Sequence, residues 1–213
     1  MSNLLSQTLP LALAAAISPV LFLLQINTLT GVRPVARGAA LTAGAAIVLI
    51  LVSTVAVLLG AANFSTSDTL QAAISIALGS LLTLVGLRAL LHPPKPKPAT
   101  TDAKSGSVGR SFLAGAAGMG SNVTTFALYI PALAVIAGSD LPLGRQGIAA
   151  LIILVTTMML AWVPLVLAVA MPGTSSRFLP ALGAWMTTNK RWIQVALGFG
   201  FGAWLLIKGA HGL

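Results

Sequence analysis

The chain has 213 residues, of which 57 % are hydrophobic and only 7 % are charged, whereas soluble domains carry about 25 % charged residues. It contains twelve Lys or Arg, three Asp or Glu and no Cys. This composition excludes a soluble domain, disulfides, thiol redox chemistry and thiolate metal sites, and it predicts an integral membrane protein.

Six apolar runs are each long enough to cross a bilayer, since about 20 helical residues span the hydrocarbon. In chain order they cover residues 4–29, 35–60, 69–91, 109–137, 144–171 and 190–210. The first run has no basic lead and continues past Ala14–Ala16, so we expect a retained helix instead of a cleaved signal. The predicted fold class is all-α, a polytopic membrane protein of six transmembrane helices in one domain, 1–213.

The first span is interrupted near the middle of the membrane by Ser18-Pro19. Proline has no N–H and clashes with the preceding turn, so carbonyl groups near Ala15 should lose their partners. Such groups are tolerated only against protein or a wet cavity. We therefore predict substrate contacts at Ser18 and Pro19, and at Gln25 and Asn27 further along the span. A plain packing kink is the alternative.

A linker rich in proline and lysine, residues 92–108, divides the chain near its middle. It separates repeat one, 1–91 with three spans, from repeat two, 109–213 with three more. Similar short sequences recur in the same order in both halves: Arg37-Gly-Ala-Ala-Leu and Arg145-Gln-Gly-Ile-Ala-Ala-Leu, then Ile76-Ala-Leu-Gly79 and Val195-Ala-Leu-Gly198. Because three helices reverse the direction of the chain, duplication predicts two inverted repeats. A six-helix bundle without duplication is the alternative.

The fourth span is the most polar. Glycines at 115, 118 and 120 precede four small polar residues, and Tyr129 and Pro131 follow. This pattern favours a broken helix beside a cavity, and the fifth span adds hydroxyl groups at a similar depth. The substrate-binding residues predicted in these two spans are Ser121, Asn122, Thr124, Thr125, Tyr129, Thr156 and Thr157. The alternative is helix packing through small residues and interhelical hydrogen bonds.

The sixth span carries Gly198 and Gly202, a pair that admits a close neighbouring helix. We expect this face to pack within the chain, and a homodimer interface is the alternative. Before the span, Phe178, Leu182 and Trp185 recur at helical spacing. They predict a short amphipathic segment on the cytoplasmic surface of the membrane.

Basic residues are concentrated on one face of the predicted bundle. Ten lie in or beside the connections after spans one, three and five, whereas the other face has only Arg145 and Lys208. This bias places the linker in the cytoplasm and both termini outside, in a multi-pass protein of the cytoplasmic (inner) membrane. The net charge of +9 therefore predicts contact with lipid headgroups and no nucleic acid partner.

Few side chains could support catalysis or metal binding. The three acidic residues, Asp68, Asp102 and Asp140, all lie in polar breaks between spans, and no nucleophile–base pair occurs. His92 and His211 fall on opposite predicted faces. We therefore expect no enzyme activity, no cofactor and no metal site. Cation-driven transport is disfavoured as well, because a cation in hydrocarbon needs a fixed negative partner.

Taken together, these features resemble the lysine-exporter (LysE) superfamily of small six-helix membrane proteins. The shared features are the proline at Pro19, the basic turn from Arg33 to Gly44, the linker between the halves and the polar cluster of the fourth span. The closest likeness is to the GAP family of actinobacteria, the glycopeptidolipid- and sulfolipid-addressing proteins. One departure is that the superfamily often has Asn-Pro-Lys in the fourth span, where this chain has only the asparagine, in Ser121-Asn122-Val123.

The resemblance implies transport, or assistance to transport, of a cell-envelope lipid, glycolipid or lipid-linked precursor. Membrane lipids and a large RND-type lipid exporter are the partners it implies. Two other functions remain open from the residues: a small-solute exporter for an amino acid or metabolite, and a non-transporting partner of an exporter or lipid enzyme.

Overall fold

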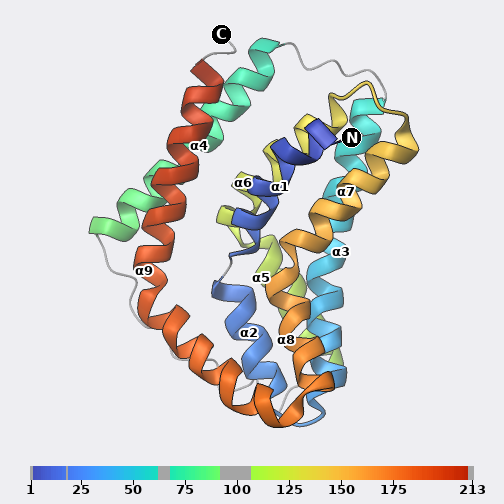
Figure 1. The fold of residues 1–213 in the computed structure, drawn as a ribbon, viewed down its shortest axis with the longest axis vertical. Helices are drawn as coiled ribbons and strands as arrows, with labels where there is room; N and C mark the ends of the chain where they lie inside the picture. The colour runs from blue at the N-terminus through green and yellow to red at the C-terminus, as the bar shows by residue number, and fades with distance from the viewer. Residues whose placement is uncertain (1, 18, 62–67, 92–106, 211–213) are drawn as a thin grey trace.

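The computed structural model describes residues 2–17, 19–61, 68–91 and 107–210 (Figure 1). Over these residues all regular structure is helical, which confirms the predicted all-α class. The nine helices in this part of the chain are α1 (Ser2–Ala16), α2 (Pro19–Leu29), α3 (Pro34–Ala61), α4 (Asp68–Leu91), α5 (Val108–Gly120), α6 (Val123–Ala137), α7 (Leu143–Thr157), α8 (Met159–Ala170) and α9 (Pro172–Ala210).

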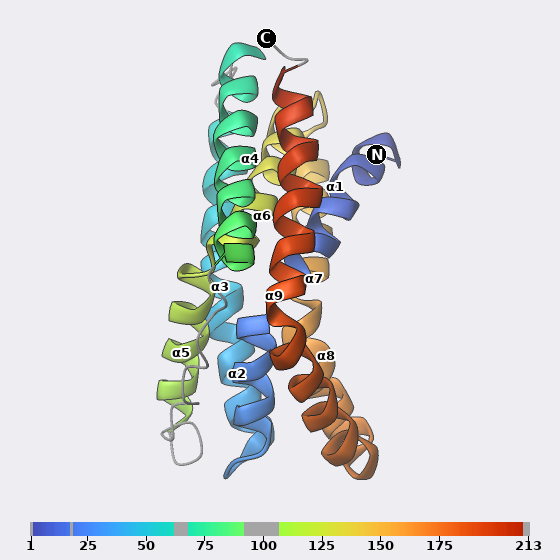
Figure 2. The same ribbon diagram turned by 90° about the vertical axis from the view of Figure 1, so that its left-hand side faces the viewer.

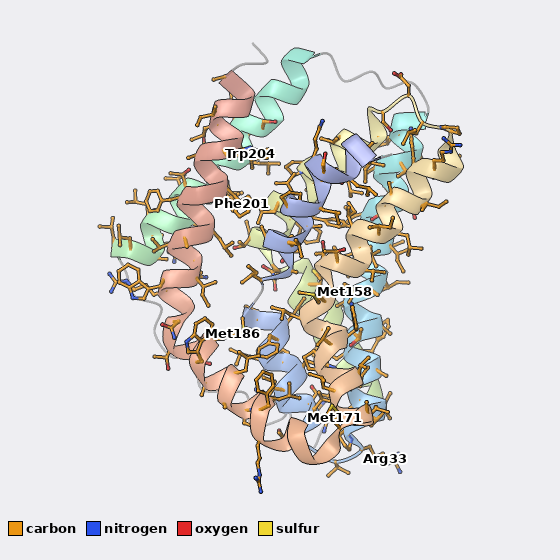
Figure 3. All side chains as sticks on the ribbon, in the orientation of Figure 1. Arg33, Met158, Met171, Met186, Phe201 and Trp204 are labelled. Atoms are coloured by element: carbon orange, nitrogen blue, oxygen red, sulfur yellow. The ribbon has the colours of Figure 1, made fainter. Side chains whose placement is uncertain are left out.

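Three of the predicted spans are bent pairs of helices. The bend is 56° between α1 and α2, 69° between α5 and α6, and 65° between α7 and α8. The first two breaks fall where the sequence predicts them, before Pro19 and at Ser121-Asn122. The third, at Met158 (Figure 3), has no glycine or proline beside it and was not predicted. Pro164 lies within α8.

The helices differ in their capacity to cross a membrane alone. In the described part of the chain, only α3 has a stretch long and apolar enough, Pro34–Leu59, and four candidate spans result if each bent pair counts as one. The other apolar helices, Ser75–Leu91 and Arg191–Ile207, are shorter. The structure therefore agrees with a membrane protein, and the full count of six spans remains a prediction.

Helix α9 corrects the expectation of a separate interfacial segment. It runs without interruption from Pro172 to Ala210 and joins the predicted amphipathic segment to the sixth span. Phe178 and Trp185 are exposed, whereas Leu182 packs beside a cluster containing Phe22 of α2. The segment is thus held against α2 by Leu182 together with Leu179 and Met186, and not by Phe178 or Trp185.

Two pairs of helices approach closely through glycine, and we call them the glycine seams. Helix α9 lies alongside α4, where a Cβ on Gly198 would stand 2.6 Å from the Cα of Gly86 (Figure 2). Helix α5 lies on α3, where a Cβ on Gly115 would stand 2.0 Å from the carbonyl oxygen of Leu41. The predicted face of Gly198 and Gly202 therefore packs within the chain. The main apolar core draws residues from α3, α4, α5 and α9 as well as from α1, α2, α6, α7 and α8. Helix α1 begins and α9 ends toward the same end of the molecule (Figure 1).

Candidate functional site

The first break meets the polar cluster of the fourth span. The carbonyl of Ala15 would ordinarily accept a hydrogen bond from the residue four positions later, which is Pro19 and has no N–H. Thr125, whose side chain is buried, donates its Oγ1 hydrogen to that carbonyl over 3.1 Å. The structure thus brings together two features that the sequence predicted separately.

The third break joins the same place through α1. Thr157, the last residue of α7, is buried with its Oγ1 3.5 Å from the carbonyl oxygen of Ala12. On the exposed side of the same break, Trp162 donates its indole N–H over 3.0 Å to the carbonyl of Val155. All three breaks therefore lie around the end of α1. We call Ala12, Ala15, Asn122, Thr125 and Thr157 the break cluster.

The second break is capped by its own side chains. Asn122 precedes α6 and accepts a hydrogen bond from the backbone N–H of Thr125 over 3.3 Å, as an N-cap residue does. Ser121 donates to the carbonyl of Ala117 over 2.7 Å and is exposed. We predicted a substrate contact at Ser121; in the structure its hydroxyl turns back to satisfy the end of α5. Thr124 is half-buried.

Tyr129 is fully buried one turn beyond Thr125. Its hydroxyl lies 2.7 Å from Oγ of Ser53, and Ser53 donates in turn to the carbonyl of Leu49 over 2.7 Å. Because the serine proton is used on Leu49, the tyrosine donates to the serine. The pair fastens α6 to α3 near the break cluster.

The remaining predicted residues that the structure describes do not join the cluster. Gln25 is buried further along α2, where its Nε2 lies 3.4 Å from the carbonyl of Gly38 and its Oε1 has no partner. Asn27 is half-buried, and Thr156 donates within α7 to the carbonyl of Ile152 over 2.8 Å. Pro19 begins α2, and Ser18 lies outside the described residues.

Sequence reasoning missed two buried polar residues at the helix starts. Arg37 was used for topology, for the internal repeat and for the family resemblance but was not predicted to be buried, yet it is 3 % exposed and its Nε donates to Oγ of Ser111 over 3.2 Å. Gln146 is also buried and donates to the carbonyls of Ser139 and Leu141 over 3.0 and 3.1 Å. Both are polar residues one turn inside a long apolar helix, and this position was the feature of the sequence that could have identified them.

Comparison with known proteins gives one match to a family model. The model is described as Sap, sulfolipid-1-addressing protein, and it matches residues 8–211. No curated protein and no solved structure matches the chain. The matched range includes both halves of the sequence and the whole break cluster.

Proposed function

Because the chain belongs to the sulfolipid-1-addressing protein family, we propose that it moves a cell-envelope lipid, glycolipid or lipid-linked precursor through the cytoplasmic membrane. It acts either as the transporter or as an accessory to a larger exporter, such as an RND-type protein. Its place in the lysine-exporter superfamily is part of the same proposal.

The break cluster is the observation that carries this function. Thr125, Thr157 and Asn122 bring two hydroxyls and an amide to the point where three broken helices meet. Broken helices that line a cavity are the usual place for a substrate in small transporters. Neutral donors and acceptors of this kind suit a polar lipid headgroup, while the acyl chains remain in the bilayer. That scheme needs no buried carboxylate, and no acid lies within the predicted spans.

We further propose six spans, with each bent pair crossing once and α4 and α9 as spans three and six. The packing of the helices supports two inverted repeats, in which α1 corresponds to α5, α2 to α6, α3 to α7 with α8, and α4 to α9. Under this correspondence, several contacts between helices occur twice, once in each symmetry-related pair. The contact of α1 with α6 corresponds to that of α5 with α2, and the contact of α1 with α7 to that of α5 with α3. Likewise, the contact of α2 with α8 corresponds to that of α6 with α3, and the contact of α4 with α6 to that of α9 with α2.

The proposed orientation puts the linker in the cytoplasm and both termini outside, on the basic bias of the connections. Thr100→Cys would introduce one thiol into this cysteine-free chain, in the linker. It should react with an impermeant maleimide in inverted vesicles and stay unlabelled in intact cells. Labelling in intact cells would reverse the orientation.

Asn122→Leu tests the transport function. The substitution keeps a similar volume and removes the amide, at a cost of about 1 kcal/mol for the lost helix cap. In a deletion strain, the wild-type gene should restore the lipid profile of the outer envelope and the variant should not. Asn189→Leu is the matched control, since it removes an exposed amide of α9.

Other outcomes would redirect the proposal. A lipid profile that is unchanged by deletion, together with an amino acid accumulating in the cytoplasm, would replace it with a small-solute exporter. Mass spectrometry of what co-purifies in mild detergent supplies the direct check: bound lipid is expected, whereas a stoichiometric exporter subunit would favour the accessory role.

A further inference from the structure

Arg191 lies where the end of α4 meets the middle of α9 (Figure 1). Its NH2 donates a hydrogen bond over 2.7 Å to the carbonyl of Leu90, in the last turn of α4. That carbonyl is one of the last four of the helix, which find no donor inside it. The positive charge also suits the negative end of the helix dipole. Arg191 therefore closes the end of the α4·α9 seam.

The guanidinium of Arg191 is not fully bonded in this position. Among the described residues it makes one other polar or ring interaction, with Trp192, whose ring centroid lies 5.6 Å from Cζ, within the range of a cation–π contact. Its Nε is buried and has no acceptor. A buried donor of this kind is rare in native proteins and calls for an explanation such as a bound water or ion.

The unbonded edge of Arg191 has the geometry of an anion site. Nε and NH2 form one edge of the planar guanidinium, which matches two oxygens of a phosphate, sulfate or carboxylate group. NH2 carries a second hydrogen, so it can bond to such a group and to Leu90 together. The residue as a whole is half-buried, and a small rotation of its side chain opens this edge to a ligand.

Positive charge is concentrated around this point. Arg88 is exposed in the same last turn of α4, and Lys190 precedes Arg191 in the sequence. Of the acids in the described part of the chain, Asp68 begins α4 at its opposite end and Asp140 lies in the connection between α6 and α7. The local electrostatic potential therefore favours an anionic ligand.

Exposed aromatic side chains continue from this point along α9. Phe178, Trp185, Trp192 and Phe199 recur every seven residues, just under two helical turns, so they lie on one face. Their exposed fractions are 53, 57, 61 and 37 %. Tryptophan is enriched where the headgroups of a membrane meet its hydrocarbon. This face offers an apolar surface to acyl chains beside a cationic group.

We propose that Arg191 and Trp192 form a binding site for an anionic membrane lipid. The phosphate or sulfate of the headgroup lies on the Nε–NH2 edge of Arg191, and the acyl chains lie along the exposed aromatic face of α9. A lipid is favoured over a soluble anion because a soluble anion would leave Trp185 and Trp192 uncovered. With α4 and α9 as spans three and six, the site lies at their cytoplasmic ends, at headgroup depth. The inference goes beyond the proposed function, since the site holds a resident lipid whether or not the protein transports one.

The test is native mass spectrometry of the purified protein in mild detergent, titrated with phosphatidylglycerol and separately with phosphatidylcholine. The first phosphatidylglycerol should bind more tightly than the first phosphatidylcholine. Arg191→Gln should weaken phosphatidylglycerol binding about fivefold, the effect of one basic residue at an anionic surface, and leave phosphatidylcholine binding unchanged. Arg145→Gln is the matched control, because it removes an exposed arginine at the start of α7 and should change neither affinity.

A second variant tests the site without removing the bond that closes α4. Trp192→Leu keeps Arg191 on Leu90 and removes the ring, and it should weaken phosphatidylglycerol binding about twofold to fivefold, the range for an exposed cation–π contact. Trp204→Leu is its control, since it removes an exposed indole near the other end of α9 (Figure 3). It should leave the affinity unchanged.

Three results would overturn the site. They are equal affinities of the wild-type protein for the two lipids, a folded Arg191→Gln variant that binds phosphatidylglycerol as the wild type does, and release of phosphatidylglycerol by excess inorganic phosphate, which would indicate a soluble-anion site. If Arg191→Gln does not fold, Trp192→Leu decides by the same criterion. The assay involves no transport, so loss of the site leaves the proposed function standing. An envelope lipid profile unchanged by deletion would likewise leave the site standing.

Discussion

The glycine seams and the break cluster both join helices, but the seams do so by close backbone packing and the cluster by side-chain hydrogen bonds. At the α3·α5 seam, a Cβ on Gly44 would stand 1.9 Å from the carbonyl oxygen of Phe112, so backbone meets backbone with no side chain between. At the break cluster, the hydroxyls of Thr125 and Thr157 reach across to carbonyls of α1. At the seams, small residues let two helices approach closely. At the break cluster, the helices that meet are interrupted.

The difference follows from which backbone groups are free. An intact helix satisfies its own carbonyls, so glycine lets it approach a neighbour closely and gain dispersion contacts in lipid. A broken helix exposes carbonyls that must find donors, because lipid offers none. Adding side-chain volume at a seam should therefore lower the stability of the folded protein, and so should removing a hydroxyl group from the break cluster. Three substitutions test this contrast.

The largest effect should come from Gly115→Ala in the α3·α5 seam. The new Cβ would lie 2.0 Å from the carbonyl oxygen of Leu41, so the two helices must separate. We expect a loss of about 3 kcal/mol of stability, at the upper end for overpacking, and poor recovery of folded protein. Thermal unfolding in detergent gives the measurement. Gly147→Ala is the control, since nothing lies within 4 Å of its Cβ position; equal melting temperatures for the two variants would contradict the seam.

Thr125→Val should have an intermediate effect at the break cluster. Valine keeps the shape and leaves the Ala15 carbonyl without its donor, which should cost about 1–2 kcal/mol. Unfolding by a denaturing detergent measures the change. Thr156→Val provides the comparison, because its hydroxyl bonds only to a carbonyl of its own helix. The contrast fails if both variants lose the same stability.

Tyr129→Phe should have the smallest effect. It removes the hydrogen bond to Ser53, while Ser53 retains its bond to Leu49. We expect a loss of about 0.6 kcal/mol, the average for an interhelical hydrogen bond in a membrane. A double-mutant cycle with Ser53→Ala isolates the pair. Additive losses in that cycle would show that the two hydroxyls do not interact.

Much of the fold followed from local chemistry. The apolar runs predicted helices, Pro19 predicted the first break, and the glycine pattern predicted the second. The break at Met158 could not be predicted, because no residue there breaks a helix by itself. It depends on neighbouring contacts, including the indole of Trp162 that satisfies the freed carbonyl of Val155.

The candidate site was only partly predictable for the same reason. The sequence indicated that a carbonyl near Ala15 would lack a partner and that the fourth span carried spare hydroxyls. It could not identify Thr125 as the donor, and it did not predict that Ser121 is exposed or that Arg37 is buried and bonded to Ser111.

The sequence by itself determined that the chain is helical and membrane-embedded, and where two of its helices break, since those properties depend on composition and on nearby residues. Only the tertiary structure decided that the three breaks meet at the end of α1 and that Arg37 is bonded to Ser111 while Gln146 keeps a free oxygen. Those outcomes depend on contacts between residues as far as 145 positions apart, whose distances in space are set by the packing of the whole bundle.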